Sequence, residues 1–174
     1  MKNNFLTSKS IFISAAILLA ALSRLIPHVP NFTPLAAMAL FGGALLNDKK
    51  VAFIIPIAAM IISDAIIGFH QHMWGVYISF ILILIMGLKL GNNIKTGPII
   101  GYSLLGSLIF FIITNFAVWL PGNFYPLSLS GLIECYVAAI PFFGNSLLGD
   151  LFYNTVLFGG FFLAKQAIPS LVKS

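Results

Sequence analysis

Charge is scarce in this sequence: 7% of its 174 residues are charged, whereas 60% are hydrophobic, and the mean hydropathy is +1.05. Soluble globular domains carry about 25% charged residues, so this composition excludes a soluble domain and indicates an integral membrane protein. Polar stretches long enough to bury a core of their own are also lacking. We therefore expect residues 1–174 to form a single transmembrane domain.

Cysteines and catalytic motifs are scarce as well. Cys135 is the single cysteine, which excludes an internal disulfide and a zinc motif built from paired cysteines. The sequence has no H-E-x-x-H zinc motif, no G-x-S-x-G nucleophile motif and no glycine-rich phosphate loop. We therefore expect neither an enzyme nor a bound cofactor. An intramembrane enzyme that assembles its residues only in space is the alternative.

Long apolar stretches make up most of the sequence. A helix that crosses a bilayer needs about 20 mostly apolar residues, and polar or proline-containing breaks separate the stretches of this chain. The sequence predicts an all-α integral membrane protein with six transmembrane helices in one bundle. The stretches are Ile11–Ile26, Phe32–Leu46, Val51–Phe69, Val76–Leu90, Pro98–Leu120 and one inside Leu132–Ala164.

Two of these stretches differ from an ordinary crossing. The second is short and holds small residues, among them Gly42 and Gly43, so it is predicted to pack tightly against its neighbours. The last is too long for one crossing and is interrupted by Pro141. We expect Leu132–Ile140 to form a short outer-side or re-entrant helix, followed by a crossing from about Asn145 to Ala164.

The lysines define the predicted orientation. Threading the six stretches through a bilayer places every lysine on one side, and this side is cytoplasmic by the positive-inside rule. Both termini are then inside, and we expect a multi-pass protein of the bacterial cytoplasmic (inner) membrane. Lysines next to apolar stretches orient the chain and contact lipid, so nucleic acid is not an expected partner. They are Lys2, Lys9, Lys49, Lys50, Lys89, Lys95, Lys165 and Lys173.

The beginning of the chain has two interpretations. Lysines before a short apolar run are also typical of a cleaved signal peptide. Retention as the first helix is favoured, because small residues at Ser10 and Ser14, and at Ala16 and Ala20, have the spacing that lets another helix approach closely.

Costly polar residues gather on the side opposite the lysines. An ionised group among lipid tails costs on the order of 3 kcal/mol or more, so these residues are predicted to face an outward-opening polar pocket. In it, Arg24 would hold an anionic group or orient an acid, the acids would accept hydrogen bonds or a cation, and the aromatic residues would form walls and a lid. The expected substrate-binding residues are Arg24, His28, Asp64, Trp74, Asn115, Trp119, Tyr125, Glu134, Asn145 and Asp150.

A purely structural role and a metal site are alternative roles for the same residues. Arg24 could pair with Asp64 or Asp150 and hold the bundle together without a ligand. Three acids against one arginine nevertheless leave a surplus, so a cation enters, a carboxyl is protonated or a histidine is charged. A metal site for nickel, cobalt or zinc is one such hypothesis, with His70 and His72 as candidate ligands and His28, Asp64, Glu134 and Cys135 as further ones.

The chain also resembles a known family. The stretch from Arg24 to Gly43, RLIPHVPNFTPLAAMALFGG, resembles the N-terminal signature of an uncharacterised family of bacterial six-helix membrane proteins described as transport proteins. Membership implies transport of a substrate that the signature does not name. Later stretches agree with the resemblance: Ser63–Asp64, Trp74–Tyr77, Thr114–Leu120 and Pro141–Tyr153.

More loosely, the chain is similar to the substrate-binding S components of energy-coupling-factor importers for vitamins and metals. That similarity implies an outer pocket for a vitamin-like compound or metal, and a transmembrane coupling subunit with ATPases that docks on the first helix. The resulting hypothesis is an S-component-like protein that takes up a small solute. A structural or accessory membrane subunit without a ligand is the alternative.

Overall fold

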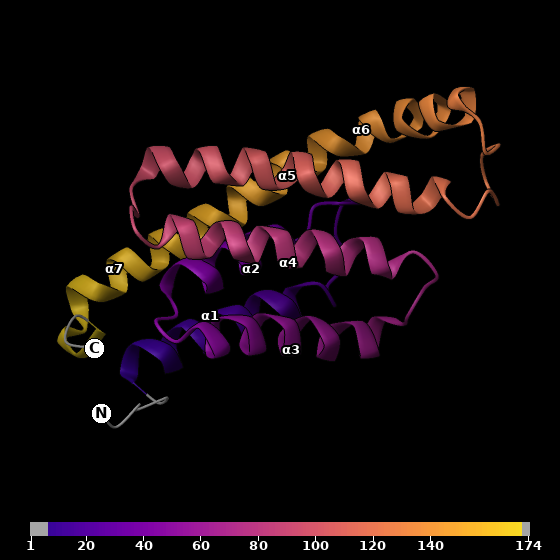
Figure 1. The fold of residues 1–174 in the computed structure, drawn as a ribbon. Helices are drawn as coiled ribbons and strands as arrows, with labels where there is room; N and C mark the ends of the chain where they lie inside the picture. Colours follow the sequence, from indigo (N-terminus) through magenta and orange to yellow (C-terminus); the bar gives the residue numbers. More distant parts are fainter. Residues whose placement is uncertain (1–6, 172–174) are drawn as a thin grey trace.

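The computed structural model describes residues 7–171, and this part of the chain is helical, without strands. Its helices lie alongside one another in an elongated bundle (Figure 1). They are α1 (Ser8–Ser23), α2 (Leu35–Leu45), α3 (Lys49–Ile67), α4 (Met73–Leu90), α5 (Thr96–Trp119), α6 (Leu129–Asn154), the π-helical turn η1 (Thr155–Gly159), α7 (Gly160–Ala167) and the 3-10 turn η2 (Pro169–Leu171).

Local sequence explains where several helices begin. The Thr7 hydroxyl accepts a hydrogen bond from the amide of Ser10 at the start of α1, and Ser128 does the same for Gly131 at the start of α6. The Asp48 carboxylate accepts from two amides in the first turn of α3. Short polar side chains at these positions satisfy amides that have no partner within the helix.

The described lysines lie at one end of the bundle, which we call the lysine end. Lys9, Lys49, Lys50 and Lys95 stand at the starts of α1, α3 and α5, and these starts lie together at the left of Figure 1 with the ends of α4 and α7. The Lys9 ammonium group donates to the Asn47 side chain at 2.9 Å, which joins two of these segments. The predicted clustering therefore holds for the described lysines; Lys2 and Lys173 lie outside the described residues.

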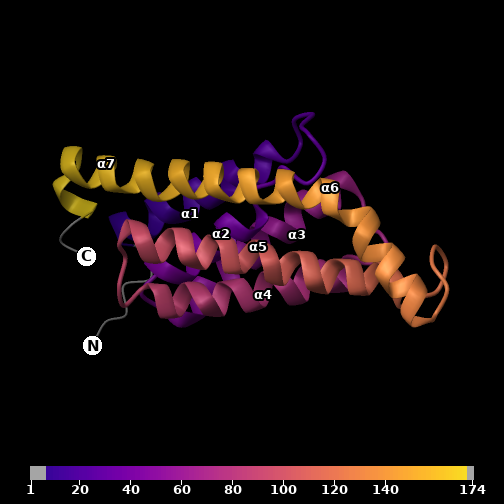
Figure 2. The same ribbon diagram turned by 90° about the horizontal axis from the view of Figure 1, so that it is seen from above.

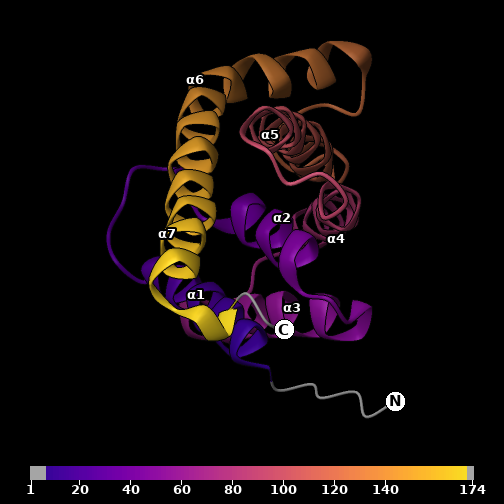
Figure 3. The ribbon, with the colours of Figure 1, turned by 90° about the vertical axis from the view of Figure 1, so that its left-hand side faces the viewer.

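The prediction for the last stretch is wrong. Leu132–Ile140 is not a separate re-entrant helix, because α6 continues through Pro141 and runs through η1 into α7 as one helical segment, Leu129–Ala167. Its first part lies at an angle to the rest (Figures 2 and 3). A proline inside a helix removes one backbone hydrogen bond and kinks the helix, which here changes its direction without ending it.

Helix α2 lies in the middle of the bundle, surrounded by other helices (Figure 3), and all of its residues are buried. A Cβ atom on Gly43 would collide with the Leu84 carbonyl oxygen, and one on Gly87 would lie 2.5 Å from the Leu40 carbonyl oxygen. Two glycines therefore let the backbones of α2 and α4 touch. The predicted close packing of this stretch is confirmed.

Within residues 7–171, four helical segments, not the predicted six, are long and apolar enough to cross a membrane: α3, α4, α5 and Leu129–Ala167. Helix α1 ends at Ser23, before Pro27, so the last residues of the predicted stretch Ile11–Ile26 lie outside the helix. Helix α2 has 11 residues and so rises only about 17 Å, against a hydrocarbon core of about 30 Å. Because protein surrounds α2 on all sides, its length does not have to match the bilayer.

Large apolar side chains are exposed along the outer faces of the long helices. Ile62 and Ile66 of α3 and Leu104 and Leu108 of α5 are examples. Soluble monomers rarely expose continuous apolar faces of this extent, whereas a lipid-facing helix requires them. Together with the long apolar helices, these faces indicate a membrane protein.

Candidate functional site

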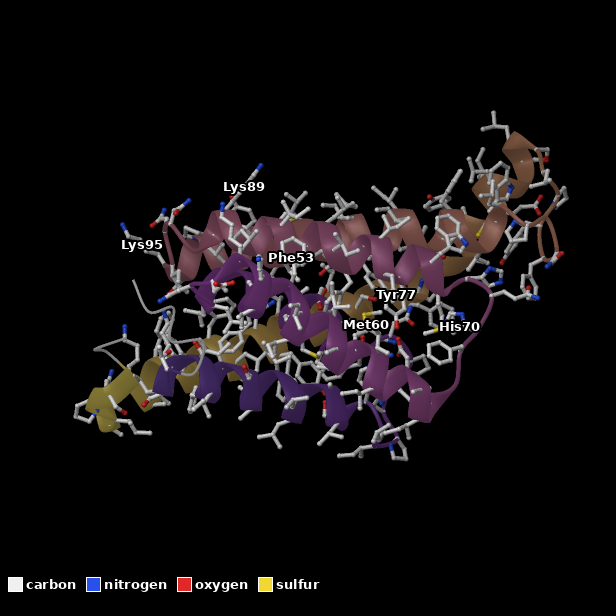
Figure 4. All side chains as sticks on the ribbon, turned by 60° about the horizontal axis from the view of Figure 1, so that its bottom comes forward. Phe53, Met60, His70, Tyr77, Lys89 and Lys95 are labelled. Atoms are coloured by element: carbon white, nitrogen blue, oxygen red, sulfur yellow. The ribbon has the colours of Figure 1, made fainter. Side chains whose placement is uncertain are left out.

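A cavity of about 320 Å³ opens at the end of the bundle opposite the lysines. Figure 4 shows this separation, with Lys89 and Lys95 at one end and His70 and Tyr77 toward the other. Side chains from five helices and two loops meet here. The lining consists of Arg24, Asn31, Thr33, Leu35, Ala36, Asp64, His70, Met73, Val76, Phe110, Phe111, Thr114, Asn115, Val118, Ala139, Ser146 and Asp150.

An ion pair between α1 and α3 forms one side of the cavity. The Arg24 guanidinium lies 2.7 Å from the Asp64 carboxylate, and the two side chains are 11% and 2% exposed. Arg24 also donates to the Ser63 hydroxyl at 2.5 Å, and the Tyr77 hydroxyl donates to the second carboxylate oxygen of Asp64 at 2.9 Å. The Asp64 charge is therefore matched, and the pair with its neighbours joins α1, α3 and α4.

The Asp150 carboxyl, from α6, lines the same cavity in a different environment. Asp150 is 5% exposed and accepts a hydrogen bond from the Ser107 hydroxyl of α5 at 2.5 Å. Among residues 7–171 the one ion pair is that of Arg24 and Asp64, so Asp150 has no cationic partner there. A buried carboxyl without a cation is expensive in a membrane protein and is by default a functional candidate.

The loop between α1 and α2 forms part of the cavity wall. Asn31 and Thr33 of this loop belong to the lining, and Asn31 adopts a positive φ of 65°. The Asn145 amide of α6 donates to the Pro30 carbonyl oxygen at 3.0 Å, and the Phe32 ring packs on α6. These contacts hold the loop against α6, so Asn145 positions the loop and is not itself part of the lining.

The structure brings together four of the ten residues predicted to bind substrate: Arg24, Asp64, Asn115 and Asp150 line the cavity. The Asn115 amide nitrogen donates to the Phe111 carbonyl oxygen of its own helix. His28 is exposed, and a nitrogen of its ring lies 2.7 Å from the Ile26 carbonyl oxygen. The residues outside the lining are His28, Trp74, Trp119, Tyr125, Glu134 and Asn145.

Three of these outlying residues, Trp119, Tyr125 and Glu134, belong to the loop between α5 and α6 or the helix ends around it. The Trp119 indole donates to the Pro126 carbonyl oxygen at 2.9 Å and so holds this loop together. Glu134 is exposed on the first part of α6, which lies across α5 at an angle to the rest of α6 (Figure 3). The aromatic residues of this loop are thus placed beside the cavity and do not form its walls.

The candidate metal ligands among the described residues do not lie close together in space. Within residues 7–171, no group of three or more His, Cys, Asp or Glu side chains is placed to hold a metal ion. His70 lines the cavity, and its ring centre lies 6.5 Å from that of His72, which packs against Phe124. Cys135 is buried and its thiol donates to the Asn115 carbonyl oxygen.

Three residues that hydrogen-bond to the charged side chains of the site were not predicted from the sequence: Ser63, Tyr77 and Ser107. Ser63 is adjacent to Asp64, and a polar neighbour of a buried acid was a usable signal. Ser107 follows Ser103 by four residues, which places both hydroxyls on one face of α5. That spacing was visible in the sequence, whereas the contact between Tyr77 and Asp64 depends on how α3 and α4 pack.

The chain belongs to DUF6580, a family of unknown function, whose family model matches residues 4–171. The match agrees with the predicted membership of an uncharacterised family, and it assigns neither transport nor a relation to S components. No curated protein and no solved structure matches the chain.

Proposed function

We propose that this member of DUF6580 is a multi-pass protein of the bacterial cytoplasmic membrane that binds a small solute in its cavity and takes it up. The lysine end faces the cytoplasm, so the cavity opens outward. The observation that carries the proposal is a cavity of about 320 Å³ that combines a buried ion pair with the unmatched carboxyl of Asp150. Polar groups of this kind are costly in a bundle that has only to hold itself together.

The lining indicates the class of solute. Because Asp64 already matches Arg24, Asp150 is the acid left to receive a hydrogen-bond donor or a positive group. Phe110, Phe111 and other apolar side chains supply an apolar wall. The volume is at the lower end of the range for ligand pockets. We infer a small organic solute, of vitamin-like size, with a donor group at one end and an apolar body.

A small organic solute suits this lining better than a bare metal ion, because no three His, Cys, Asp or Glu side chains of the described residues lie close enough together to hold a metal. An accessory subunit without a ligand would fill the same space with side chains. A coupling subunit with ATPases, which an S component would require, rests on the resemblance alone and is left out of this proposal.

Native mass spectrometry tests the proposal on full-length protein extracted gently from membranes of its own host. We expect wild type to carry a small molecule and Asp150→Asn to lose it, because the amide has no negative charge for a positive group and replaces one acceptor oxygen with a donor. Asp48→Asn is the matched control: it changes the same residue type at the lysine end, where asparagine still caps α3.

Retention of the same molecule by Asp150→Asn would contradict the proposed site. A wild-type protein that is free of any small molecule, and that binds none from a host extract, would contradict the proposed function.

A further inference from the structure

A chain of buried polar side chains leads from the cavity toward the lysine end. Asp150 and Asn154 lie one turn apart on α6, and Ser107 and Ser103 lie one turn apart on α5. The two helices run in opposite directions (Figure 2), so Asp150 faces Ser107 near the cavity and Asn154 faces Ser103 deeper in the bundle. All four residues are buried.

The Ser107 hydroxyl has one proton and two acceptors within reach. It lies 2.5 Å from the Asp150 carboxyl and 3.1 Å from the Ser103 carbonyl oxygen. While Asp150 is ionised, the Ser107 hydroxyl can donate its single proton to only one of these two acceptors at a time. When Asp150 carries a proton, Asp150 donates to the Ser107 oxygen and Ser107 donates to Ser103, so both contacts form together. The two hydrogen bonds, between Asp150 and Ser107 and between Ser107 and Ser103, therefore form at the same time when Asp150 carries a proton.

At the deeper end of this row of polar side chains, one hydrogen-bond acceptor has no partner. The Asn154 amide nitrogen donates to the Ser103 hydroxyl at 3.0 Å, while its side-chain carbonyl oxygen is buried without a partner. Asn154 is 3% exposed, so an unpaired oxygen there requires a water molecule or another donor. The π-helical turn η1 begins at the next residue, and π turns inside α-helices occur frequently at functional sites.

A second cavity begins at the inner end of this row of polar side chains, at Ser103 and Asn154. It measures about 190 Å³ and is lined by Ser103 and Asn154, together with Thr155 and with Thr96, the first residue of α5. Lys95 precedes Thr96, so this cavity reaches toward the lysine end. These polar side chains therefore lie between the outer cavity and a second, mostly apolar cavity whose lining includes the first residue of α5.

The charged and titratable groups around Asp150 do not offer it a partner. Helix α2, which packs against α6, has no titratable residue. On α5, Tyr102 lines a separate groove and the groups toward Asp150 are the serine hydroxyls. On α6 itself, Tyr153 hydrogen-bonds to Ser23. The titratable groups that share the cavity with Asp150 are Arg24, Asp64 and His70.

We propose that Asp150 binds and releases protons, and that Ser107, Ser103 and Asn154 form a proton path to the lysine end, which couples solute uptake to inward proton movement. The coupling rests on the proposed uptake function. A hydronium ion in the outer cavity gives a proton to the carboxylate, which leaves a water molecule and a neutral acid. The acid later passes a proton through Ser107 to a water near Asn154, which becomes hydronium, and the carboxylate is restored. The two serine hydroxyls are about one helical turn apart, roughly 5–6 Å, a distance that one water molecule can bridge.

Two measurements on the full-length protein in liposomes test this proposal without knowledge of the solute. The first is labelling with dicyclohexylcarbodiimide, which reacts with protonated carboxyls in apolar surroundings, followed by peptide mass spectrometry. We expect an adduct on Asp150 that increases as the pH falls, and none on the ion-paired Asp64. The absence of an Asp150 adduct between about pH 5 and 9, the range in which buried carboxyls take up protons, would overturn the proposal.

The second measurement is proton flux into liposomes that contain a pH-sensitive dye, driven by a potassium diffusion potential in the presence of a host extract that supplies the solute. We expect wild type to exceed protein-free liposomes, and Ser107→Ala and Asn154→Leu to lower the initial rate roughly tenfold or more, because each interrupts proton transfer. Ser79→Ala is the matched control, since Ser79 is a buried serine of α4 that donates only to its own helix.

Flux equal to that of protein-free liposomes, equal rates in Ser107→Ala and Ser79→Ala, or movement of sodium in place of protons would each overturn the path. A protein that retains a solute by native mass spectrometry and fails both proton tests refutes the coupling alone, whereas one that conducts protons and binds no solute refutes the uptake function.

Discussion

At the scale of single residues, the two buried aspartates of the cavity differ in what surrounds them. Asp64 has the Arg24 guanidinium at 2.7 Å and the Tyr77 hydroxyl at 2.9 Å. Asp150 has the Ser107 hydroxyl and no cation among the described residues. The first carboxylate stabilises a buried cation, whereas the second has no charge to balance. The same residue type is therefore expected to serve stability at one position and function at the other.

Substitutions at the two aspartates separate these roles. We expect Asp64→Ala to lower the free energy of unfolding by about 3–5 kcal/mol, because it leaves the Arg24 guanidinium buried without a partner. Asp150→Asn strands no cation, so its melting temperature in detergent should stay close to that of wild type. Thermal unfolding followed by size-exclusion chromatography measures both. Equal destabilisation by the two variants would show that Asp150 also has a mainly structural role.

At the scale of helices, the sequence predicted those elements whose ends depend on local signals. The expected Val51–Phe69, Val76–Leu90 and Pro98–Leu120 agree with α3, α4 and α5 to within three residues, because polar caps and breaks bound these apolar runs. For α2 the predicted bounds agree equally well, but the helix is too short for the predicted crossing, and for α6 the predicted break before Asn145 is absent. The burial of α2 inside the bundle and the continuation of α6 past Pro141 depend on tertiary contacts that no local pattern records.

The contact between α2 and α4 gives a test at this scale. Gly43→Ala would place a methyl group against the Leu84 carbonyl oxygen, and the two backbones would have to separate. We expect it to cost about 1–3 kcal/mol or more and to reduce the yield of folded protein. Gly101→Ala on α5 is the control, because its new methyl group meets no atom within 4 Å and alanine favours a helix. Similar yields from the two variants would contradict the close α2–α4 contact.

At the scale of the whole molecule, polar groups are divided between two ends. Described lysines occupy one end, and the cavity with Arg24, Asp64 and Asp150 lies toward the other. The cost of polar groups in apolar stretches singled out these three residues and Asn115 in the sequence, and all four line the cavity. The other predicted residues lie outside its lining for a physical reason. Trp119 and Asn145 use their polar atoms on the backbone carbonyls of Pro126 and Pro30, which only the folded loops bring within reach.

Solute uptake requires the cavity to open on the side of the membrane opposite the lysines, and single-cysteine labelling tests this orientation. Cys135 is replaced with alanine, and single cysteines are introduced by His70→Cys at the cavity and by Asn92→Cys in the loop between α4 and α5. Intact cells are then treated with a membrane-impermeant maleimide. We predict labelling of the His70 position from outside and labelling of the Asn92 position only after the membrane is opened. The reverse pattern, or equal labelling of both positions in intact cells, would contradict an outward-opening cavity.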